Sequence, residues 1–442
     1  MSFSHLPPAL TRVFHALAHW LQKRTAAPLP LLLYGLLFAK GRRTVTSWFR
    51  AAGITTDFRP AYYTVCVGGQ HTTALAVTVW QTVRPRLPGP RLLVAIDDTP
   101  TARYGPCVEG AGKHHHPSPG PAGAPYLYGH VWVTLAALAQ HPAWGTLALP
   151  LQAQLYIRQR DLPQVPADRR RPFRTKLQLA TDQLLWLQRW LGEAYRERWL
   201  VVDGGYAKRP FLRPAQQAGW VVVSRLRKDA ALWSVPPTTR RPGQRGPLPT
   251  YGKERLSRAK RAGQARGWQQ LECVQYGQRV TKTYKTFLAT WRPAGGGIRV
   301  VLVKEAHGWL AFFGTEPRAT PQEILETMAQ RGALEQTFKE VKEGWGAGQQ
   351  QVTNLHSNEG CFNLNLWMDS LVEAWAWDQT EEQLVDRSAS PWDREPRRPS
   401  HADKRKALQR EVLEQEILAA LGEWPNRERI QALAQRLLGL AG

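Results

Sequence analysis

Two short apolar runs, each followed at once by an aspartate, constrain this chain more than any other feature. Residues 92–96 are apolar throughout and lead into Asp97, and residues 199–202 lead into Asp203 in the same way. An apolar run of this length between polar residues is typical of a strand that is buried on both faces, as in a parallel sheet. The ends of such strands form the edge at which open α/β folds place their sites. The sequence therefore predicts an α/β fold with carboxylates along one edge of a sheet.

Each aspartate also has a purely structural interpretation. Asp97 is followed by Asp98, and an aspartate at the end of a strand often caps the next turn. Because neighbouring residues of a strand point to opposite faces, only one of the pair is expected to face a site. Asp203 precedes two glycines, which is a turn signal, so it is open to the same interpretation.

A third acidic residue, Glu335, lies in a long stretch with helical periodicity. In a regular helix Arg331, Phe338 and Lys342 fall on the same face as Glu335, within about a sixth of the circumference. Ordinary ion pairing at four-residue spacing explains the same pattern. Carboxylates that are brought together repel one another unless a divalent cation joins them. Two or three carboxylates around Mg²⁺ are the usual equipment for phosphodiester chemistry.

The formal charge of +24, from 59 basic and 35 acidic residues, favours a polyanionic partner. Nucleic acid is the first candidate, and anionic membranes or ribosomes are the alternative. The four cysteines have no metal-ligand spacing, which fits a reducing compartment and excludes a zinc finger or a disulfide framework. No signal peptide or membrane-spanning segment is recognisable, so we expect a soluble, cytoplasmic protein, and the family resemblance described below adds that it is bacterial and nucleoid-associated. P-loop, G-x-S-x-G and H-E-x-x-H motifs are absent.

The patterning predicts four regions. They are a helical N-terminal region that is a candidate for DNA binding (1–88), an α/β domain that carries the acidic residues and is catalytic by the resemblance described below (89–209 and 319–377), a β-rich insertion (210–318), and a linker with C-terminal helices (378–442). In the first region a basic turn leads into a helix that Thr44 or Thr46 caps. That arrangement is compatible with DNA binding, but many structural helix pairs look the same.

Within these regions the periodicity predicts further elements. We expect strands near 126–133, 147–156, 220–226, 271–276, 284–291 and 298–304, and helices near 174–196, around Glu335, up to 377, and at 402–421 and 426–439. Residues 105–125 are expected to form a loop rich in glycine, proline and histidine.

Several other residues are weaker candidates. The histidines at 114–116 are adjacent, so they cannot easily converge on one metal ion, and His130 in an apolar strand is more typical of a core. The arginines at 169–171 are interpreted either as a phosphate-binding run or as solvated charge. The tryptophans of the insertion are expected to be mostly core, although one could stack on an unpaired base; they include Trp268, Trp291 and Trp309.

The helical motif resembles that of a known family. DDE transposases of insertion sequences, which have a ribonuclease-H-like catalytic domain, include a subgroup with a Tyr-x2-Arg-x3-Glu-x6-Lys signature. This chain reads Met328-x2-Arg331-x3-Glu335-x6-Lys342. Met328 departs from the tyrosine of the signature, and a thioether cannot donate the hydrogen bond that a phenol gives to phosphate.

The two aspartate motifs, residues 97–99 and 203–208, are also similar to the first and second acidic motifs of that family, and the resemblance covers about residues 90–375. It implies a ribonuclease-H-like mixed sheet with a β-rich insertion before the last acidic residue, plus helical N- and C-terminal regions. Asp97 is preferred to Asp98 because the acid of the family directly follows the last apolar residue of the strand.

The resemblance also implies a mechanism. Asp97, Asp203 and Glu335 would be the catalytic residues and would hold two Mg²⁺ ions, for which Mn²⁺ substitutes. Arg331 and Lys342 would bind DNA phosphates near the scissile bond.

The implied function is DNA transposition, which consists of cleavage at the ends of a mobile element and strand transfer to target DNA. The expected partners are double-stranded DNA carrying terminal inverted repeats, target DNA, and a second copy of the chain on paired ends. The alternatives are a nuclease of the same fold and a non-catalytic DNA-binding protein descended from a transposase, for which Met328 is a hint. The terminal sequence, the target preference and the excision route cannot be derived from the sequence.

Overall fold

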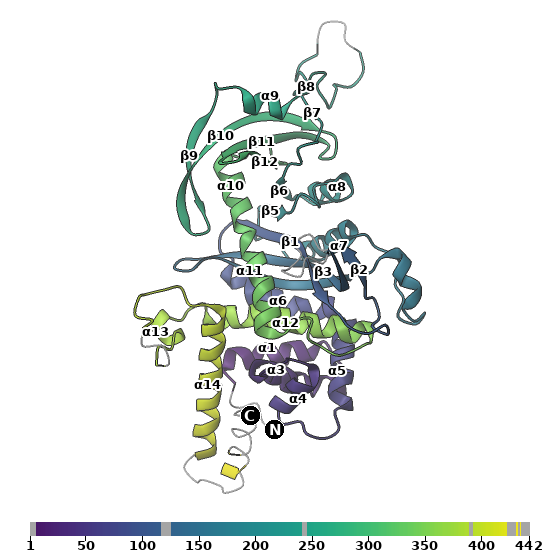
Figure 1. Cartoon of the computed structure of the whole chain (residues 1–442), viewed down its shortest axis with the longest axis vertical. Helices are drawn as coiled ribbons and strands as arrows, with labels where there is room; N and C mark the ends of the chain where they lie inside the picture. Colours follow the sequence, from purple (N-terminus) through teal and green to yellow (C-terminus); the bar gives the residue numbers. More distant parts are fainter. Residues whose placement is uncertain are drawn as a thin grey trace.

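A large mixed sheet forms the centre of the molecule, and helices cover both of its faces (Figure 1). The computed structural model describes residues 6–115, 125–240, 245–388 and 392–421, together with 430, 431 and 434. The predicted α/β class with a ribonuclease-H-like mixed sheet is confirmed.

The N-terminal region is helical, as predicted. Its elements are α1 (Pro8–His19), α2 (Lys23–Ala26), α3 (Leu29–Phe38), α4 (Val45–Ala51), α5 (Arg59–Gln70), α6 (Thr72–Val83) and the 3-10 turn η1 (Arg84–Arg86). Thr44 caps α4 because its hydroxyl oxygen accepts a hydrogen bond from the backbone N–H of Ser47. In the basic turn before it, Arg43 packs against the residues that follow Lys342, through bonds to Gln349 and to the carbonyl of Glu343.

The next segment forms the central part of the mixed sheet. Its elements are β1 (Arg91–Ala102), β2 (Gly112–His115), β3 (Tyr126–His141), β4 (Gly145–Tyr156), η2 (Gln159–Gln164), α7 (Lys176–Gln188), β5 (Glu197–Val202), α8 (Arg209–Gln217) and β6 (Val221–Arg225). The strands lie in the order β4-β3-β1-β5-β6. β3 is antiparallel to both β4 and β1, whereas β1, β5 and β6 are parallel, so the sheet is mixed.

Two local predictions for this segment are wrong. The strand through residues 92–96 does not end at Asp97 but continues to Ala102, because its partner β3 is long enough to pair with it as far as Gly129. The predicted loop at 105–125 contains the short strand β2, which pairs with β3. Residues 116–124, including His116, lie outside the described residues.

The insertion continues the same sheet. Its elements are β7 (Leu232–Trp233), β8 (Arg255–Leu256), α9 (Arg258–Gly263), β9 (Gln269–Gln275), β10 (Gln278–Trp291), β11 (Gly296–Glu305) and β12 (Gly308–Gly314). β12 pairs with β6, so these strands curve away from the central sheet without a break in the hydrogen bonding (Figure 1). β6 lies within the predicted range of the insertion but pairs with β5. The division into four regions stays a prediction.

The last segment is helical. It comprises α10 (Pro321–Gln330), α11 (Gly332–Glu340), the π-helical turn η3 (Val341–Trp345), α12 (Leu355–Ala376), α13 (Glu381–Leu384) and α14 (His401–Leu421). The second predicted terminal helix, near 426–439, lies almost wholly outside the described residues. No helix among the described residues has both the length and the apolar character that crossing a bilayer requires.

The two faces of β1 pack against different helices. Leu92, Val94 and Ile96 belong to the large core that includes α6 and α12, in which Trp132 and Phe362 stack with ring centroids 4.2 Å apart. Ala95 packs instead with Leu334 and the neighbouring apolar side chains of α11. Because side chains alternate along a strand, the face of Ala95 is also the face of Asp97, and this alternation brings Asp97 under α11.

Candidate active site

The register of the parallel strands places Asp97 beside Asp203. Ile96 of β1 pairs with Val202 of β5, and this is the last parallel pair between the two strands. The residue that follows Ile96 and the residue that follows Val202 are both aspartates, Asp97 and Asp203. Burial raises the pKa of Asp97 to about 7; Arg331 opposes this rise, and the charges of Asp98 and Asp203 add to it. Asp97 is therefore a carboxyl group that is costly to ionise unless a cation accompanies it.

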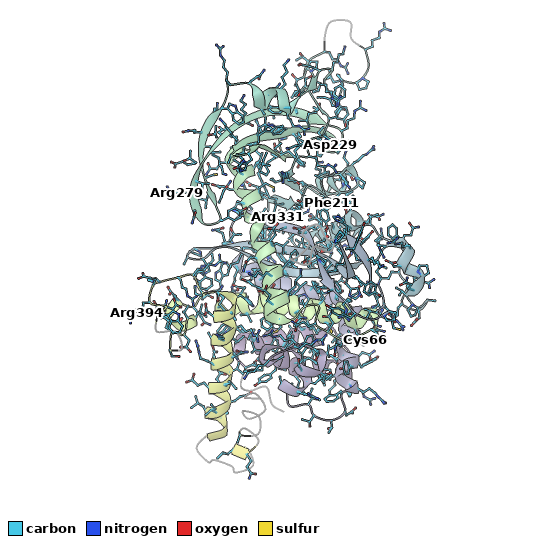
Figure 2. All side chains as sticks on the ribbon, viewed as in Figure 1. Cys66, Phe211, Asp229, Arg279, Arg331 and Arg394 are labelled. Carbon is cyan, nitrogen blue, oxygen red and sulfur yellow. The ribbon has the colours of Figure 1, made fainter. Side chains whose placement is uncertain are left out.

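Arg331 supplies such a positive charge between two of the predicted acids. One guanidinium nitrogen lies 2.5 Å from a carboxylate oxygen of Asp97, and the other lies 2.6 Å from an oxygen of Glu335. Figure 2 labels Arg331 at mid-height of the molecule, below the insertion strands. Burial lowers the pKa of Arg331, but Asp97, Glu335 and Asp203 outweigh burial, and the net pKa is raised. The charges of all three predicted acids therefore act on the guanidinium and raise its pKa.

The helix that carries these residues is not the single regular helix that the periodicity predicted. Arg331 lies at the junction where α10 ends and α11 begins, and after Glu340 the chain widens into the π-helical turn η3. Single π-helical turns inside α-helices occur frequently at functional sites. Arg331 keeps helical backbone angles at this junction and its side chain reaches Asp97, while Leu334 and Phe338 stay buried against the sheet.

Lys342, in η3, is not joined to the three acids. In the part of the chain that the structure describes, its ammonium group has no hydrogen-bond or ion-pair partner. Burial lowers the pKa of Lys342. A cation that is partly withdrawn from water without an acidic partner is costly, so an external anion would stabilise it.

Asp203 is exposed at the start of a turn. The backbone N–H of Gly205 donates to its carboxylate at 3.0 Å, so the turn interpretation also holds. Asp203 further lines a cavity of about 520 Å³ between the central sheet and the insertion. The other lining residues are Gly204, Gly205, Arg225, Leu226, Arg227, Lys228, Asp229, Trp309, Leu310 and Ala311. A carboxylate at this position is open to ligands that enter from the solvent.

Asp98 lies on the opposite face of β1, as the alternation of the strand requires. The hydroxyl of Tyr206 donates to one of its oxygens at 2.9 Å, and the ammonium of Lys176 lies 2.6 Å from the other. Burial, with the charge of Asp98 next, raises the pKa of Tyr206 well above its usual value, so the phenol stays a donor. The sequence identified neither partner, although Tyr206 follows the Asp203 turn directly.

Met328 fills an apolar space. It is half-buried and packs against both apolar clusters on this face of the sheet, near Leu93. The position that holds a tyrosine in the signature therefore contributes packing here.

The weaker candidates are mostly engaged elsewhere. His130 is fully buried, and burial lowers its pKa to about 3. Within the arginine run, Arg169 pairs with Glu109, and Arg171 pairs with Glu359. Trp291 is buried against Phe313, whereas Trp309 lines the cavity beside Asp203.

The donor set suits a hard divalent cation. Asp97 and Asp203 lie side by side and Glu335 is linked to Asp97 through Arg331, so the groups offered here are carboxylates. Mg²⁺ and Mn²⁺ prefer ligands of this kind.

A comparison with protein families agrees with this geometry. The family model described as DDE superfamily endonuclease matches residues 12–294, and the chain belongs to this family. The matched residues contain Asp97 and Asp203, and the match ends before Glu335. A search of curated proteins finds no match to the chain. The family as a class acts on DNA with divalent metals, which fits the donor set.

Proposed function

We propose that the protein is a DNA transposase that cleaves the ends of a mobile element and joins them to target DNA. The observation that carries this proposal is that Arg331 bridges Asp97 and Glu335, while the register of a parallel strand pair places Asp203 beside Asp97. The net charge of +24 supports a DNA substrate, because it favours association with a polyanion.

The reaction would be an in-line displacement at a phosphodiester bond. Mg²⁺, two ions per site, would activate the attacking oxygen and stabilise the departing one when the three carboxylates hold it. Arg331 now neutralises Asp97 and Glu335. With a cation in that role, the guanidinium would be released to bind a phosphate oxygen, for which its paired N–H groups are suited. Lys342, which has no acidic partner among the described residues, would bind a second phosphate.

The cavity beside Asp203 would accept DNA next to the scissile bond. Arg225 and Lys228 offer charge, and among the described residues neither side chain has a hydrogen-bond or ion-pair partner. Trp309, which lines this cavity, offers an aromatic face on which an unpaired base would stack. Since transposition joins two ends, a homodimer on paired ends is part of the proposal.

A cleavage assay tests this function. The purified chain is incubated with a duplex that carries the inverted repeat flanking its gene, in Mg²⁺, in Mn²⁺ or in EDTA. We expect nicking at the element boundary that requires metal, followed by joining of the new 3′ end to a second duplex. Cleavage without joining would favour a nuclease of the same fold. Salt-sensitive binding without any cleavage would favour a non-catalytic descendant and contradict the proposal.

A further inference from the structure

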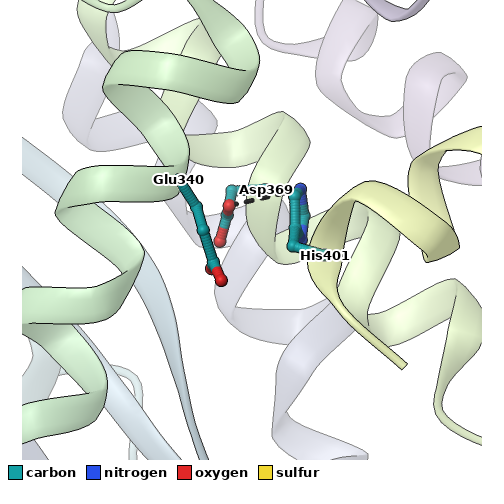
Figure 3. A group of neighbouring side chains, drawn as sticks. All are labelled: Glu340, Asp369 and His401. Carbon is teal, nitrogen blue, oxygen red and sulfur yellow. Dashed lines mark ion pairs between the residues drawn. The ribbon is translucent and has the colours of Figure 1, made fainter. Parts of the chain in front are cut away.

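A second cluster of potential metal ligands lies at the other end of α11. Glu340 ends that helix, Asp369 lies in the middle of α12, and His401 is the first residue of α14. One ligand atom from each lies within 4.8 Å of the other two. Figure 3 shows the three side chains converging from three different helices. This cluster shares no residue with the site around Asp97.

Asp369 is the least satisfied member of the cluster. Its residue is only 1% exposed, and in the described part of the chain neither carboxylate oxygen accepts a hydrogen bond. One oxygen lies 3.3 Å from Nε2 of His401. Burying an ionised carboxylate in this way is expensive unless a positive charge compensates it. Burial accordingly raises the pKa of Asp369 to about 8.

The orientation of His401 leaves its Nε2 atom facing Asp369. Nδ1 lies 2.7 Å from a carboxylate oxygen of Glu373, to which it donates, and Lys404 neutralises Glu373 from the other side. A histidine whose Nδ1–H is held by a carboxylate presents Nε2 as a ligand, which is the arrangement that metal-binding histidines usually have.

The competing arrangement is an imidazolium ion. Burial lowers the pKa of His401, but Asp369 and Glu373 outweigh burial and raise the pKa to about 9. However, the indole N–H of Trp345 points at Nε2 from 2.8 Å. An indole only donates, so this contact requires a lone pair on Nε2 and leaves no proton there to reach Asp369.

We propose that Glu340, Asp369 and His401 bind a divalent transition-metal ion of the Zn²⁺ class. One imidazole nitrogen with two carboxylate oxygens favours Zn²⁺ over Mg²⁺, which prefers oxygen ligands alone. Lys404 pairs with Glu373 and acts on Asp369 only through space, and burial of Asp369 outweighs the charges of His401 and Lys404 together. The cluster borders a cavity of about 950 Å³, from which water can complete the coordination. The ion must displace the indole N–H from Nε2, so its affinity is expected to lie below that of a closed structural zinc site.

Such an ion would join the C-terminal helix to the helix of the candidate active site. Glu340 and Glu335 both lie on α11, one at its end and one in its first turn. α14 is otherwise tied to this region through η3, by the His401–Trp345 contact and by a bond from Arg405 to the carbonyl of Gly344. Metal binding would therefore stabilise the position of α11 against α12 and α14. The inference does not depend on the proposed function.

Metal binding by the full chain tests the proposal. Asp97→Asn, Asp203→Asn and Glu335→Gln are combined as a background, so that the first site cannot contribute. Equilibrium dialysis against Zn²⁺ should then give one bound ion per chain, and Zn²⁺ should raise the Tm. Mg²⁺ should do neither. Adding Glu340→Gln or Asp369→Asn should weaken Zn²⁺ binding by about tenfold or more, whereas Glu343→Gln, an exposed carboxylate one turn further on, should leave it unchanged.

Two outcomes would overturn the proposal. One is a background protein that binds no Zn²⁺, which would leave an imidazolium–carboxylate pair as the occupant of the cluster. The other is binding that Glu340→Gln leaves unchanged. Circular dichroism checks that each variant is folded. If Asp369→Asn fails to fold, Glu340→Gln decides, because Glu340 is half-buried at a helix end and its loss leaves the core intact.

Discussion

Asp97 and Asp98 are neighbours on one strand, yet the two faces of β1 give them opposite surroundings. On the α11 face Asp97 meets Arg331 and lies beside Asp203, so carboxylates outnumber the cation that joins them. On the α7 face Asp98 has a phenol on one oxygen and an ammonium on the other. The Asp97 face therefore has more carboxylates than cations, at an exposed edge of the sheet. On the Asp98 face, each carboxylate oxygen has a partner from the chain itself.

The partners around each carboxylate, and not the residue type, therefore distinguish a candidate metal ligand (Asp97) from a structural side chain (Asp98). On the Asp97 face the proposed function requires a cation to take over the role of Arg331, which pairs with both Asp97 and Glu335. Nothing comparable is needed on the Asp98 face, since each oxygen is already satisfied by the chain itself. Substitutions on the two faces of β1 should therefore differ in their effects on cleavage and on stability.

The largest effect is expected from the acid that is exposed beside Asp97. Asp203→Asn keeps the shape of the side chain and the turn at Gly205, but it removes one of the charges that would hold a cation. Metal-dependent cleavage should fall by about a thousandfold or more. Rates on the inverted-repeat duplex measure this, with unchanged circular dichroism as the control. Cleavage within a few-fold of the native rate would exclude Asp203 from the site.

Arg331→Gln should destabilise the metal-free protein. It leaves the Asp97 carboxylate without its cation in a place where both side chains are less than a fifth exposed, and a loss of about 2 kcal/mol is expected. Chemical denaturation in EDTA measures it. Lys339→Gln, an exposed residue of the same helix, serves as the control. Mg²⁺ should restore part of the loss in Arg331→Gln by replacing the missing charge.

The same pair predicts a pH dependence. Because the pKa of Asp97 is raised to about 7 in the folded chain, the folded state holds a proton that the unfolded state has already lost above about pH 4. The contribution of this group to stability is therefore present at low pH and is lost as the pH rises toward and through about 7. In EDTA, Asp97→Asn should make the pH dependence flatter between about pH 4 and about pH 7. An unchanged profile would show that Asp97 is not the titrating group.

Lys342→Met should separate stability from DNA binding. Removing a partly buried cation without an acidic partner should leave the free energy of unfolding unchanged or raised. The affinity for DNA should fall, and the slope of log affinity against log salt should decrease by about one. Fluorescence anisotropy at several salt concentrations measures both. A lower stability together with an unchanged salt slope would indicate that Lys342 has a structural role.

The smallest effect is expected on the balanced face. Asp98→Asn keeps an acceptor for Tyr206 and loses the ion pair with Lys176, which is partly exposed. We expect a stability loss of about 1 kcal/mol at most. Thermal denaturation measures it, with Lys176→Gln as the matched variant. Since both variants remove the same ion pair, their effects should be similar and should not add in the double variant.

The sequence predicted the strands that carry the aspartates because their signal is local. Residues 92–96 and 199–202 are apolar in every position, and only a strand buried on both faces explains such a run. The turn after Asp203 and the helix around Glu335 were likewise predicted from adjacent residues. The alternation of a strand was sufficient to expect that Asp97 and Asp98 diverge.

What the sequence could not provide was register and long-range contact. The pairing of Ile96 with Val202, which aligns the two aspartates, depends on the whole sheet. β1 continues past Asp97 because β3 is long, and the contact of Arg331 with Asp97 depends on how the α10–α11 junction packs over β1. Asp369 and His401 carry no local signal at all, since their meeting depends on how three helices pack.

The most direct test of the account is the comparison of Asp97→Asn with Asp98→Asn in the same cleavage assay. Both replacements change one carboxylate to an amide on the same strand, so they share any general effect on folding. The account predicts that Asp97→Asn abolishes Mg²⁺-dependent cleavage at the element end, whereas Asp98→Asn retains it to within about tenfold. Retention of cleavage in Asp97→Asn together with its loss in Asp98→Asn would contradict the assignment of the α11 face as the active site.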